Sequence, residues 1–282
     1  MALRPVARRR TPRQKLLMAG TWLIAAACVA NVFPIYWMVT TSLKSEADIH
    51  TYPPLLLFPI TLENYRELFV TARFFSPMRN SLIVALGSTV GSVVLGSMAA
   101  YALGRFKVGG KVFPFWILAM RMFPPIVLAL PVFFLASGAG LLNSQLALIA
   151  VYLMLNLPFV IWLMRGFFME IPLSLEEAAW IDGCSRWQAM IRVVLPLARP
   201  GLAVTSIFVF IASWNEFLLA AILTGPETRT APVAAAQFSG EYGILWGPMM
   251  AAGTVIVLPM LAVALLVQRY IVRGLALGAV KG

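Results

Sequence analysis

Six long apolar runs follow one another along the chain, and short polar connections separate them. The runs are approximately Leu16–Val39, Ser81–Leu103, Val112–Ala136, Leu142–Phe167, Gly201–Thr224 and Trp246–Val267. A helix that crosses a membrane needs about 20 mainly apolar residues, and each run has about that length. The pattern therefore predicts an all-α polytopic membrane protein with six transmembrane helices.

The composition agrees with a chain that lies mostly in lipid. Hydrophobic residues make up 61% of the 282 residues and charged residues only 12%, whereas a soluble domain carries about 25% charged residues. The mean hydropathy is +0.86. The net charge of +11 does not indicate a nucleic-acid partner, because the basic residues stand between the apolar runs, where they orient membrane helices. Membrane lipids are the expected surroundings.

The basic residues are divided unevenly between alternate connections. Of the 22 Lys and Arg residues, sixteen fall in the N-terminal tail, the second and fourth connections and the C-terminal end, and five fall in the other segments. Positive residues accumulate on the cytoplasmic side of membrane proteins. Both termini are therefore expected in the cytoplasm, which an even number of spans also requires. The first run is too long for a cleaved signal peptide and is interpreted as a retained helix.

Prolines and small residues interrupt two of the runs. Pro124 and Pro125 lie in the third run, and a proline inside a helix removes a backbone hydrogen bond and kinks the helix. The third span is therefore expected to be bent. The second run carries Gly87, Gly91 and Gly96, which let a neighbouring helix approach closely.

The connection at about residues 168–200 is the one long polar stretch between two very apolar ones. Ser174 followed by Glu177 has the spacing of a capping box, which starts a helix, and Gly183 permits the left-handed turn that ends one. A second amphipathic segment, 186–194, follows. The pattern predicts a helix, a turn and a helix beside the membrane; a generic helical hairpin fits it equally. The acidic residues that the first helix would offer to a groove in a partner are Glu176, Glu177 and Asp182.

This segment resembles the EAA loop of ABC-importer permeases, the membrane subunits that dock on a separate ATPase. The family pattern is E-A-A, three residues, G, nine residues and I-x-L-P. The positions that match are Glu177, Ala178, Ala179, Gly183, Leu195 and Pro196. Val193 stands where the family usually has Ile, a mild departure. By this resemblance, the residues that couple the chain to the ATPase are expected to be Glu177, Ala178, Ala179, Asp182, Gly183, Leu195 and Pro196.

Other segments extend the resemblance over nearly the whole chain, from the first run onward. They are Thr41–Lys44, Asn80–Ser81, Ala100–Ala102 before Arg105–Phe106, Trp214–Phe217 and the C-terminal Gly278–Gly282. Together they are similar to the carbohydrate-uptake permeases, and within these to the subfamily typified by the maltose permease protein G.

The resemblance implies a type I ABC importer (MetI-like) permease fold. It implies transport of a sugar, or of a related solute such as a polyol, across the bacterial cytoplasmic membrane by alternating access. The implied partners are a second permease subunit in a heterodimer, an ABC ATPase dimer and an extracytoplasmic solute-binding protein. No cofactor is expected on this chain, since ATP and Mg would be used by the partner ATPase.

The runs and the resemblance together predict how the chain is divided. The expected parts are a cytoplasmic tail (1–15), a first transmembrane helix (16–43), an extracytoplasmic segment (44–79), an ABC type-1 transmembrane domain of five helices (80–270) and a second cytoplasmic tail (271–282). The coupling loop, about 168–200, lies inside the five-helix domain.

A few polar residues lie inside the predicted spans. A charge at the centre of a bilayer is costly, so Arg121 is expected to face the bundle interior or a wet cavity, with snorkelling to the interface as the alternative. Trp214, Asn215 and Glu216 lie together in the fifth run. They could offer an aromatic face and polar atoms to a sugar, or they could form a structural cluster between helices. These four residues are the candidates for the substrate pathway.

Nothing in the sequence indicates an enzyme. The stretch Gly104–Lys111 has the look of a phosphate loop, but its Lys comes one position late and Val112 stands where Ser or Thr is needed. The chain has one His and no pair of carboxylates in a span, so no catalytic dyad and no metal site is predicted. The alternative function is an ion-gradient-driven secondary transporter. That class requires internal repeats and intramembrane acidic groups, and only Glu216 qualifies.

Overall fold

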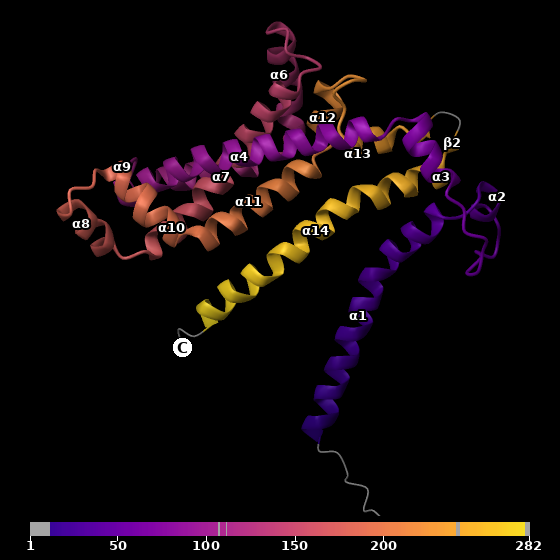
Figure 1. Cartoon of the computed structure of the whole chain (residues 1–282), viewed down its shortest axis with the longest axis horizontal. Coiled ribbons are helices and arrows are strands. Elements are labelled where there is room, and N and C mark those ends of the chain that lie inside the picture. The colour runs from indigo at the N-terminus through magenta and orange to yellow at the C-terminus, as the bar shows by residue number, and fades with distance from the viewer. Residues whose placement is uncertain (1–11, 107, 111, 241–242, 280–282) are drawn as a thin grey trace, which may run out of the picture.

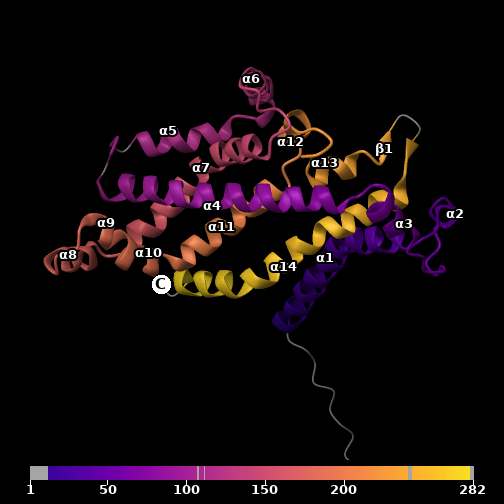
Figure 2. The same ribbon diagram turned by 45° about the horizontal axis from the view of Figure 1, so that its top comes forward.

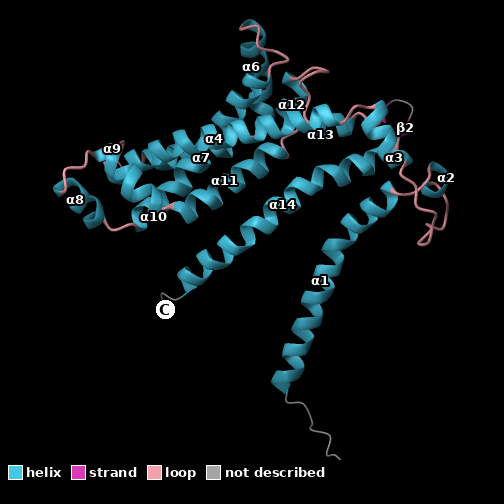
Figure 3. Ribbon diagram, viewed as in Figure 1, coloured by secondary structure: helices cyan, strands magenta, loops and turns pink. Residues whose placement is uncertain are grey.

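The computed structural model describes residues 12–106, 108–110, 112–240 and 243–279, and the side chains within 20–265 of these. The described chain is helical apart from one short hairpin (Figure 3). The longer helices are α1 (Pro12–Ser42), α4 (Phe75–Arg105), α6 (Pro125–Gly138), α7 (Gln145–Glu170), α11 (Arg199–Trp214) and α14 (Trp246–Ala279). The shorter helices are α2 (Glu46–Ile49), α3 (Glu63–Arg66), α5 (Phe113–Ala119), α8 (Leu173–Ile181), α9 (Arg186–Ala189), α10 (Leu195–Leu197), α12 (Leu218–Leu223) and α13 (Ala231–Ala236). Two π-helical turns (Glu67–Thr71 and Met190–Val194), a 3-10 turn (Met120–Met122) and strands β1 (Ser239–Gly240) and β2 (Gly243–Ile244) complete the set.

The centre of the molecule is the contact between α4 and α7, with α11 alongside (Figure 1). A Cβ atom built at Gly91 would lie 2.6 Å from Leu153 of α7, and one at Gly96 would lie 2.5 Å from Val160. A side chain at either glycine would collide with these side chains of α7 unless they moved. The close approach predicted from the glycines of the second run is therefore confirmed.

Among the described residues, four helices are long and apolar enough to cross a membrane, and up to six spans result if each of two bent helix pairs counts as one. The third predicted span bends by 90° between Met122 and Pro125, so the bend expected from its prolines is confirmed. The second bent pair, Arg186–Leu197 with Arg199–Trp214, bends by 79°. This bend turns the polar segment before α11 away from the axis of α11.

The fifth predicted span, Gly201–Thr224, is not one continuous helix, which corrects the prediction. Helix α11 ends at Trp214 and α12 begins at Leu218. The side chain of Glu216 causes the new start, because its carboxylate accepts hydrogen bonds from the backbone N–H groups of Leu219 (2.8 Å) and Ala220 (3.1 Å). Such acceptors satisfy the free N–H groups of a helix N-terminus.

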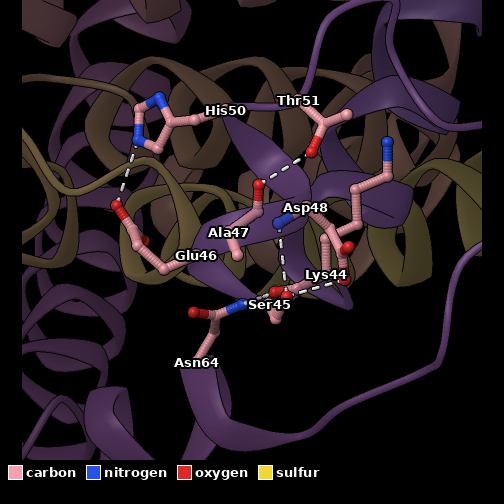
Figure 4. Close-up of polar contacts among 8 residues, drawn as sticks. All are labelled: Lys44, Ser45, Glu46, Ala47, Asp48, His50, Thr51 and Asn64. Atoms are coloured by element: carbon pink, nitrogen blue, oxygen red, sulfur yellow. Dashed lines mark hydrogen bonds and ion pairs between the residues drawn. The ribbon is translucent and has the colours of Figure 1, made fainter.

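The two ends of the bundle carry different structures. Helices α8 and α9 lie at one end, and α2, α3 and the β-hairpin lie at the other, in both views (Figures 1 and 2). At this end α3 and the π-helical turn after it form one short helical segment, Glu63–Thr71. Here the amide of Asn64 donates a hydrogen bond to the carbonyl of Ser42 (2.9 Å). It also donates to the carbonyl of Lys44 (2.8 Å), and the Ser45 hydroxyl caps α2 by accepting from the N–H of Asp48 (Figure 4). These bonds fix the chain where it leaves α1.

Helix α1 packs on α14 and bonds α3 through Ser42 at its C-terminal end, while its N-terminal part stands apart from the bundle (Figure 1). None of the hydrophobic window of its candidate span, Gly20–Ser42, is buried inside this chain, so this surface must face lipid or another subunit. Residues 1–11 and 280–282 of the two predicted tails lie outside the described residues. Within the described part, α1 already begins at Pro12 and α14 continues to Ala279.

Candidate coupling helix and transport cavity

Helix α8 and the turn after it hold five of the seven residues predicted to couple the chain to an ATPase, namely Glu177, Ala178, Ala179, Asp182 and Gly183. The helix begins after Pro172, which has no side-chain capping bond, so the predicted capping box of Ser174 and Glu177 is wrong. Proline sets φ for a helix start and needs no donor partner, which places Ser174 inside the first turn. The capping box lies instead at the start of α9, where Ser185 accepts from the N–H of Gln188 and Gln188 accepts from the N–H of Ser185.

One face of α8 points away from the rest of the chain. Glu177, Ala178 and Asp182 are exposed, and Ile181 is 87% exposed although its side chain is large and apolar. Residues one turn apart share a helix face, so these four side chains form one surface with acidic edges and an apolar centre. We call it the outward face of α8. Ile181 was missed at the sequence level, although its position four residues after Glu177 places it on this face.

The end of α8 is a tight turn. Gly183 adopts φ +88°, in the left-handed region, and the N–H of Cys184 donates to the carbonyl of Ala179 (2.9 Å). This is the closure that a glycine after a helix permits. Ala179, unlike its neighbour Ala178, is buried at 8% exposure. Leu195 and Pro196 are half-buried in α10, where Leu195 packs against the core next to Val194, so neither shares the outward face.

The opposite face of α8 carries Glu176, which the sequence pattern had placed on the acidic surface. That prediction is wrong, because Glu176 is completely buried. Its carboxylate lies 2.5 Å from Nε of Arg105 and accepts a hydrogen bond from the hydroxyl of Tyr101 (2.6 Å). Removing one partner of a buried ion pair typically costs about 3–5 kcal/mol. Glu176 and Glu177 are adjacent in sequence but lie on different faces of α8. Glu176 is therefore bonded inside the chain, and Glu177 is exposed.

A cavity of about 490 Å³ lies where α7 meets the two broken regions, the bend before α6 and the gap between α11 and α12. Its wall is mostly apolar and includes Phe123, Leu128 and Met154. Five polar side chains also line it. They are Arg121, Tyr152, Asn156, Ser213 and Glu216.

Hydrogen bonds connect the polar side chains of the cavity. The hydroxyl of Tyr152 donates to the Glu216 carboxylate (2.5 Å), and the amide of Asn156 donates to the Ser213 hydroxyl (3.1 Å). The guanidinium of Arg121 donates to the carbonyl of Leu155 (3.0 Å). Among the described residues, no carboxylate lies within ion-pair distance of Arg121. The cavity therefore contains a cation and an anion that are hydrogen-bonded but not paired with each other.

Two of the four predicted pathway residues line the cavity and two do not. Arg121 and Glu216 do. The Trp214 ring is 2% exposed, stacks on Phe210 and donates to the carbonyl of Ile256 in α14 (3.3 Å), so it belongs to helix packing.

The side chain of Asn215 bonds back to the carbonyl of Ile211 (3.0 Å) in its own helix and is not among the residues that line the cavity. Tyr152 was missed. Its spacing of four residues from Asn156 on α7 was the signal that could have found it.

The bent helical bundle, the exposed polar helix at one end and the polar cavity between broken helices define a membrane transport subunit. The chain belongs to the family of binding-protein-dependent transport system inner membrane components, whose model matches residues 92–277. It is a permease of an ABC importer, and ATP is hydrolysed on a separate subunit of such systems. The predicted family is confirmed.

Relatives of known assignment cover nearly the whole chain. The trehalose transport system permease protein SugB of Mycobacterium tuberculosis is 40% identical over 270 residues, which are 94% of this chain and 98% of that protein. The trehalose/maltose transport system permease protein MalG of Thermococcus litoralis is 38% identical over 272 residues, 95% and 96% of the two chains.

The fold is also found in a solved structure. A chain of a bacterial ABC transporter involved in the import of the acidic polysaccharide alginate superposes with a TM-score of 0.79 at 23% identity, over 94% of this chain and 99% of that one. The predicted all-α importer permease fold is thereby confirmed.

Proposed function

We propose that this chain is one of two different permease subunits of an importer that carries a small sugar, such as a disaccharide, or a polyol. Its partners are the second permease, two ATPase subunits and an extracytoplasmic solute-binding protein. Both termini and α8 lie in the cytoplasm, and α2, α3 and the β-hairpin lie on the outer side. The figures support this arrangement, since α8 stands at the opposite end of the bundle from these elements (Figures 1 and 2).

The observation that carries the coupling is the two-sided character of α8. Its outward face exposes Ile181 at 87% between the carboxylates of Glu177 and Asp182, so it offers a partner both an apolar side chain to bury and two acceptors to bond. Its other face is tied to the bundle through Glu176. A partner that binds the outward face and moves would therefore move α8 together with the transmembrane helices to which α8 is bonded.

The cavity supports a sugar as the cargo. Its volume of about 490 Å³ lies within the range of small-molecule sites, roughly 300–1,000 Å³. An apolar wall suits the carbon face of a sugar ring, and the polar side chains suit its hydroxyls. Arg121 donates, Glu216 accepts, and the hydroxyl of Tyr152 can do both. Of the two relatives named above, SugB is assigned to trehalose transport and MalG to trehalose and maltose transport, so these sugars are the first to test.

Uptake measured in cells tests the proposal. Cells that express the transporter with an affinity tag on this chain should accumulate trehalose or maltose, and the tag should co-purify an ATPase. Depleting ATP should stop uptake, whereas collapsing the ion gradients at constant ATP should not. Uptake that follows the ion gradient and ignores ATP would instead support a secondary transporter.

A further inference from the structure

A buried ion pair in the described part of the chain joins two helices that differ in role. Arg105 is the last residue of α4, and Glu176 lies in the first turn of α8. Their side chains are 10% and 0% exposed, and their charged atoms are 2.5 Å apart. The second carboxylate oxygen of Glu176 accepts from Tyr101, one turn earlier on α4. We call Tyr101, Arg105 and Glu176 the α4–α8 junction.

Arg105 also holds the chain just before α8. Its Nη2 donates to the carbonyl of Ile171 (2.8 Å), the residue that ends α7. The guanidinium of Arg105 thus contacts Ile171, directly after α7, and Glu176, in the first turn of α8. A planar guanidinium with several donors in fixed geometry suits this double contact, which a lysine could not reproduce.

A second cation closes the same corner from the other side. The guanidinium of Arg186, at the start of α9, lies 4.9 Å from the ring of Phe106 and 5.4 Å from the ring of Trp180. Phe106 follows α4 directly, and Trp180 lies in α8. The guanidinium groups of Arg105 and Arg186 therefore join three elements, which are the C-terminal end of α4, helix α8 and the start of α9. Helix α8 cannot shift without either moving α4 or breaking these contacts.

Helix α4 leads from this corner to the cavity. Its 31 residues span about 46 Å at 1.5 Å per residue. Partway along, the hydroxyl of Ser88 donates to Ser213 (3.0 Å), which lines the cavity and accepts from Asn156. The close packing of Gly91 and Gly96 on α7 leaves α4 no room to slide independently. A displacement of its end is therefore carried along its length.

We propose that the α4–α8 junction transmits the movement of α8 to the cavity, with Arg105 and Glu176 as positioning residues of the transport cycle. The inference rests on the proposed function, since it assumes that an ATPase moves α8. A helix held only by surface contacts could rotate on the bundle without effect. A helix held by a desolvated ion pair, a carbonyl bond and two ring contacts moves with the helix it is bound to.

The test uses Glu176→Gln in the full complex, purified through a tag on this chain. Glutamine keeps the size of the side chain and can still bond Arg105 and Tyr101, but it removes the charge attraction. The readout is a single cysteine in the cavity, Met154→Cys, with Cys28 and Cys184 replaced by Ser. Its rate of reaction with N-ethylmaleimide is measured with and without ATP and vanadate, together with ATP hydrolysis. The matched control is Glu170→Gln, an exposed glutamate at the end of α7.

In the parent background and in the control, ATP and vanadate should change the labelling rate by about five-fold or more, a typical size for coupling between sites. In Glu176→Gln the change should fall below about two-fold while hydrolysis stays within about two-fold of the parent. A role in folding alone would lower assembly, hydrolysis and the labelling response together. A full labelling response in assembled Glu176→Gln overturns the proposal.

Tyr101→Phe is a second, milder variant for the case that Glu176→Gln does not fold, because it removes one hydroxyl and leaves the ion pair intact. If Glu176→Gln does not assemble, a reduced response in Tyr101→Phe supports the junction and an unchanged response overturns it. The two proposals fail in different ways. A parent complex that hydrolyses no ATP overturns the proposed function and the junction's role with it, whereas variants that respond like an active parent overturn the junction alone.

Discussion

The α4–α8 junction and the transport cavity use charged residues in opposite ways. At the junction, Arg105 and Glu176 are buried and paired with each other at 2.5 Å. In the cavity, Arg121 bonds only neutral acceptors, Leu155 and Asn156, and Glu216 is held by a tyrosine hydroxyl and two backbone N–H groups. The junction has no charge left for a ligand, whereas the cavity has both signs.

Under the proposed function, this difference would separate residues that transmit movement from residues that bind solute. A buried pair that loses one partner destabilises the protein strongly. A cavity residue that bonds neutral groups and faces open space can be changed with less effect on folding. Mutations at the two places should therefore divide into losses of stability and losses of transport.

The largest effect is expected for Arg105→Ala. It leaves the Glu176 carboxylate buried without its cation, which should cost about 3–5 kcal/mol of folding stability. Thermal unfolding of the purified complex and the amount of protein in membranes should both show the loss. Glu170→Ala, at an exposed position near the same corner, should stay within about 0.5 kcal/mol of the parent. Equal thermal stability of Arg105→Ala and Glu170→Ala would show that Arg105 and Glu176 do not form a charged pair in the folded protein.

Ile181→Asp should produce the next largest effect, on binding instead of folding. Burying an isoleucine in an interface is worth about 2 kcal/mol, so the affinity for the ATPase should fall about 30-fold. The thermal stability of the permease itself should not change, because Ile181 is 87% exposed. The measurement is retention of the ATPase on the tagged permease over a range of ATPase concentrations. Unchanged retention would remove the outward face of α8 from the docking surface.

A change in the cavity should reduce transport with little change in stability. Arg121→Gln removes a charged donor from the cavity, and a hydrogen bond to a charged group is worth about 1.5–3 kcal/mol. Uptake of trehalose or maltose below saturation should fall about ten-fold or more. Asn215→Ala, whose side chain bonds only its own helix, is the comparison and should transport normally. If the two variants behave alike, the cavity is not the solute path.

The smallest free-energy effect, about 1–2 kcal/mol, is expected at Gly183, where the change should nevertheless uncouple transport. The backbone there has φ +88°, and a residue with a β-carbon in the left-handed region loses about 1–2 kcal/mol. Gly183→Val should therefore distort the turn after α8 and reduce uptake per ATP hydrolysed, while abundance remains near that of the parent. Gly110→Val imposes similar strain at φ +69° in another turn and should leave the ratio of uptake to hydrolysis unchanged. Normal coupling in Gly183→Val would separate this turn from the coupling mechanism.

Much of the fold could be predicted because membrane helices are encoded by long apolar runs. The bend of the third span follows from Pro124 and Pro125, and the approach of α4 to α7 follows from small residues such as Gly96. The break after Trp214 could not be predicted, since no proline or glycine marks it. The apolar pattern continues through it, and the break depends on the side chain of Glu216 capping α12.

The sites could be predicted only in part, because a motif does not say which way a side chain points. Glu176 and Glu177 are adjacent and chemically identical, yet one is buried and the other exposed. The partner that decides this, Arg105, lies 71 positions earlier in the chain. Trp214 likewise resembled a sugar-binding aromatic residue until its packing against α14 was known. Long-range contacts of this kind are not visible in a local pattern.

The proposed coupling requires that an ATP-hydrolysing subunit in the cytoplasm binds the outward face of α8. Cross-linking from Ile181→Cys, in a chain with Cys28 and Cys184 replaced by Ser, tests it most directly. In intact cells this cysteine should join to the ATPase and should not react with a membrane-impermeant maleimide added outside. A cysteine that forms no cross-link to an ATPase, or that the external reagent labels, would contradict the claim.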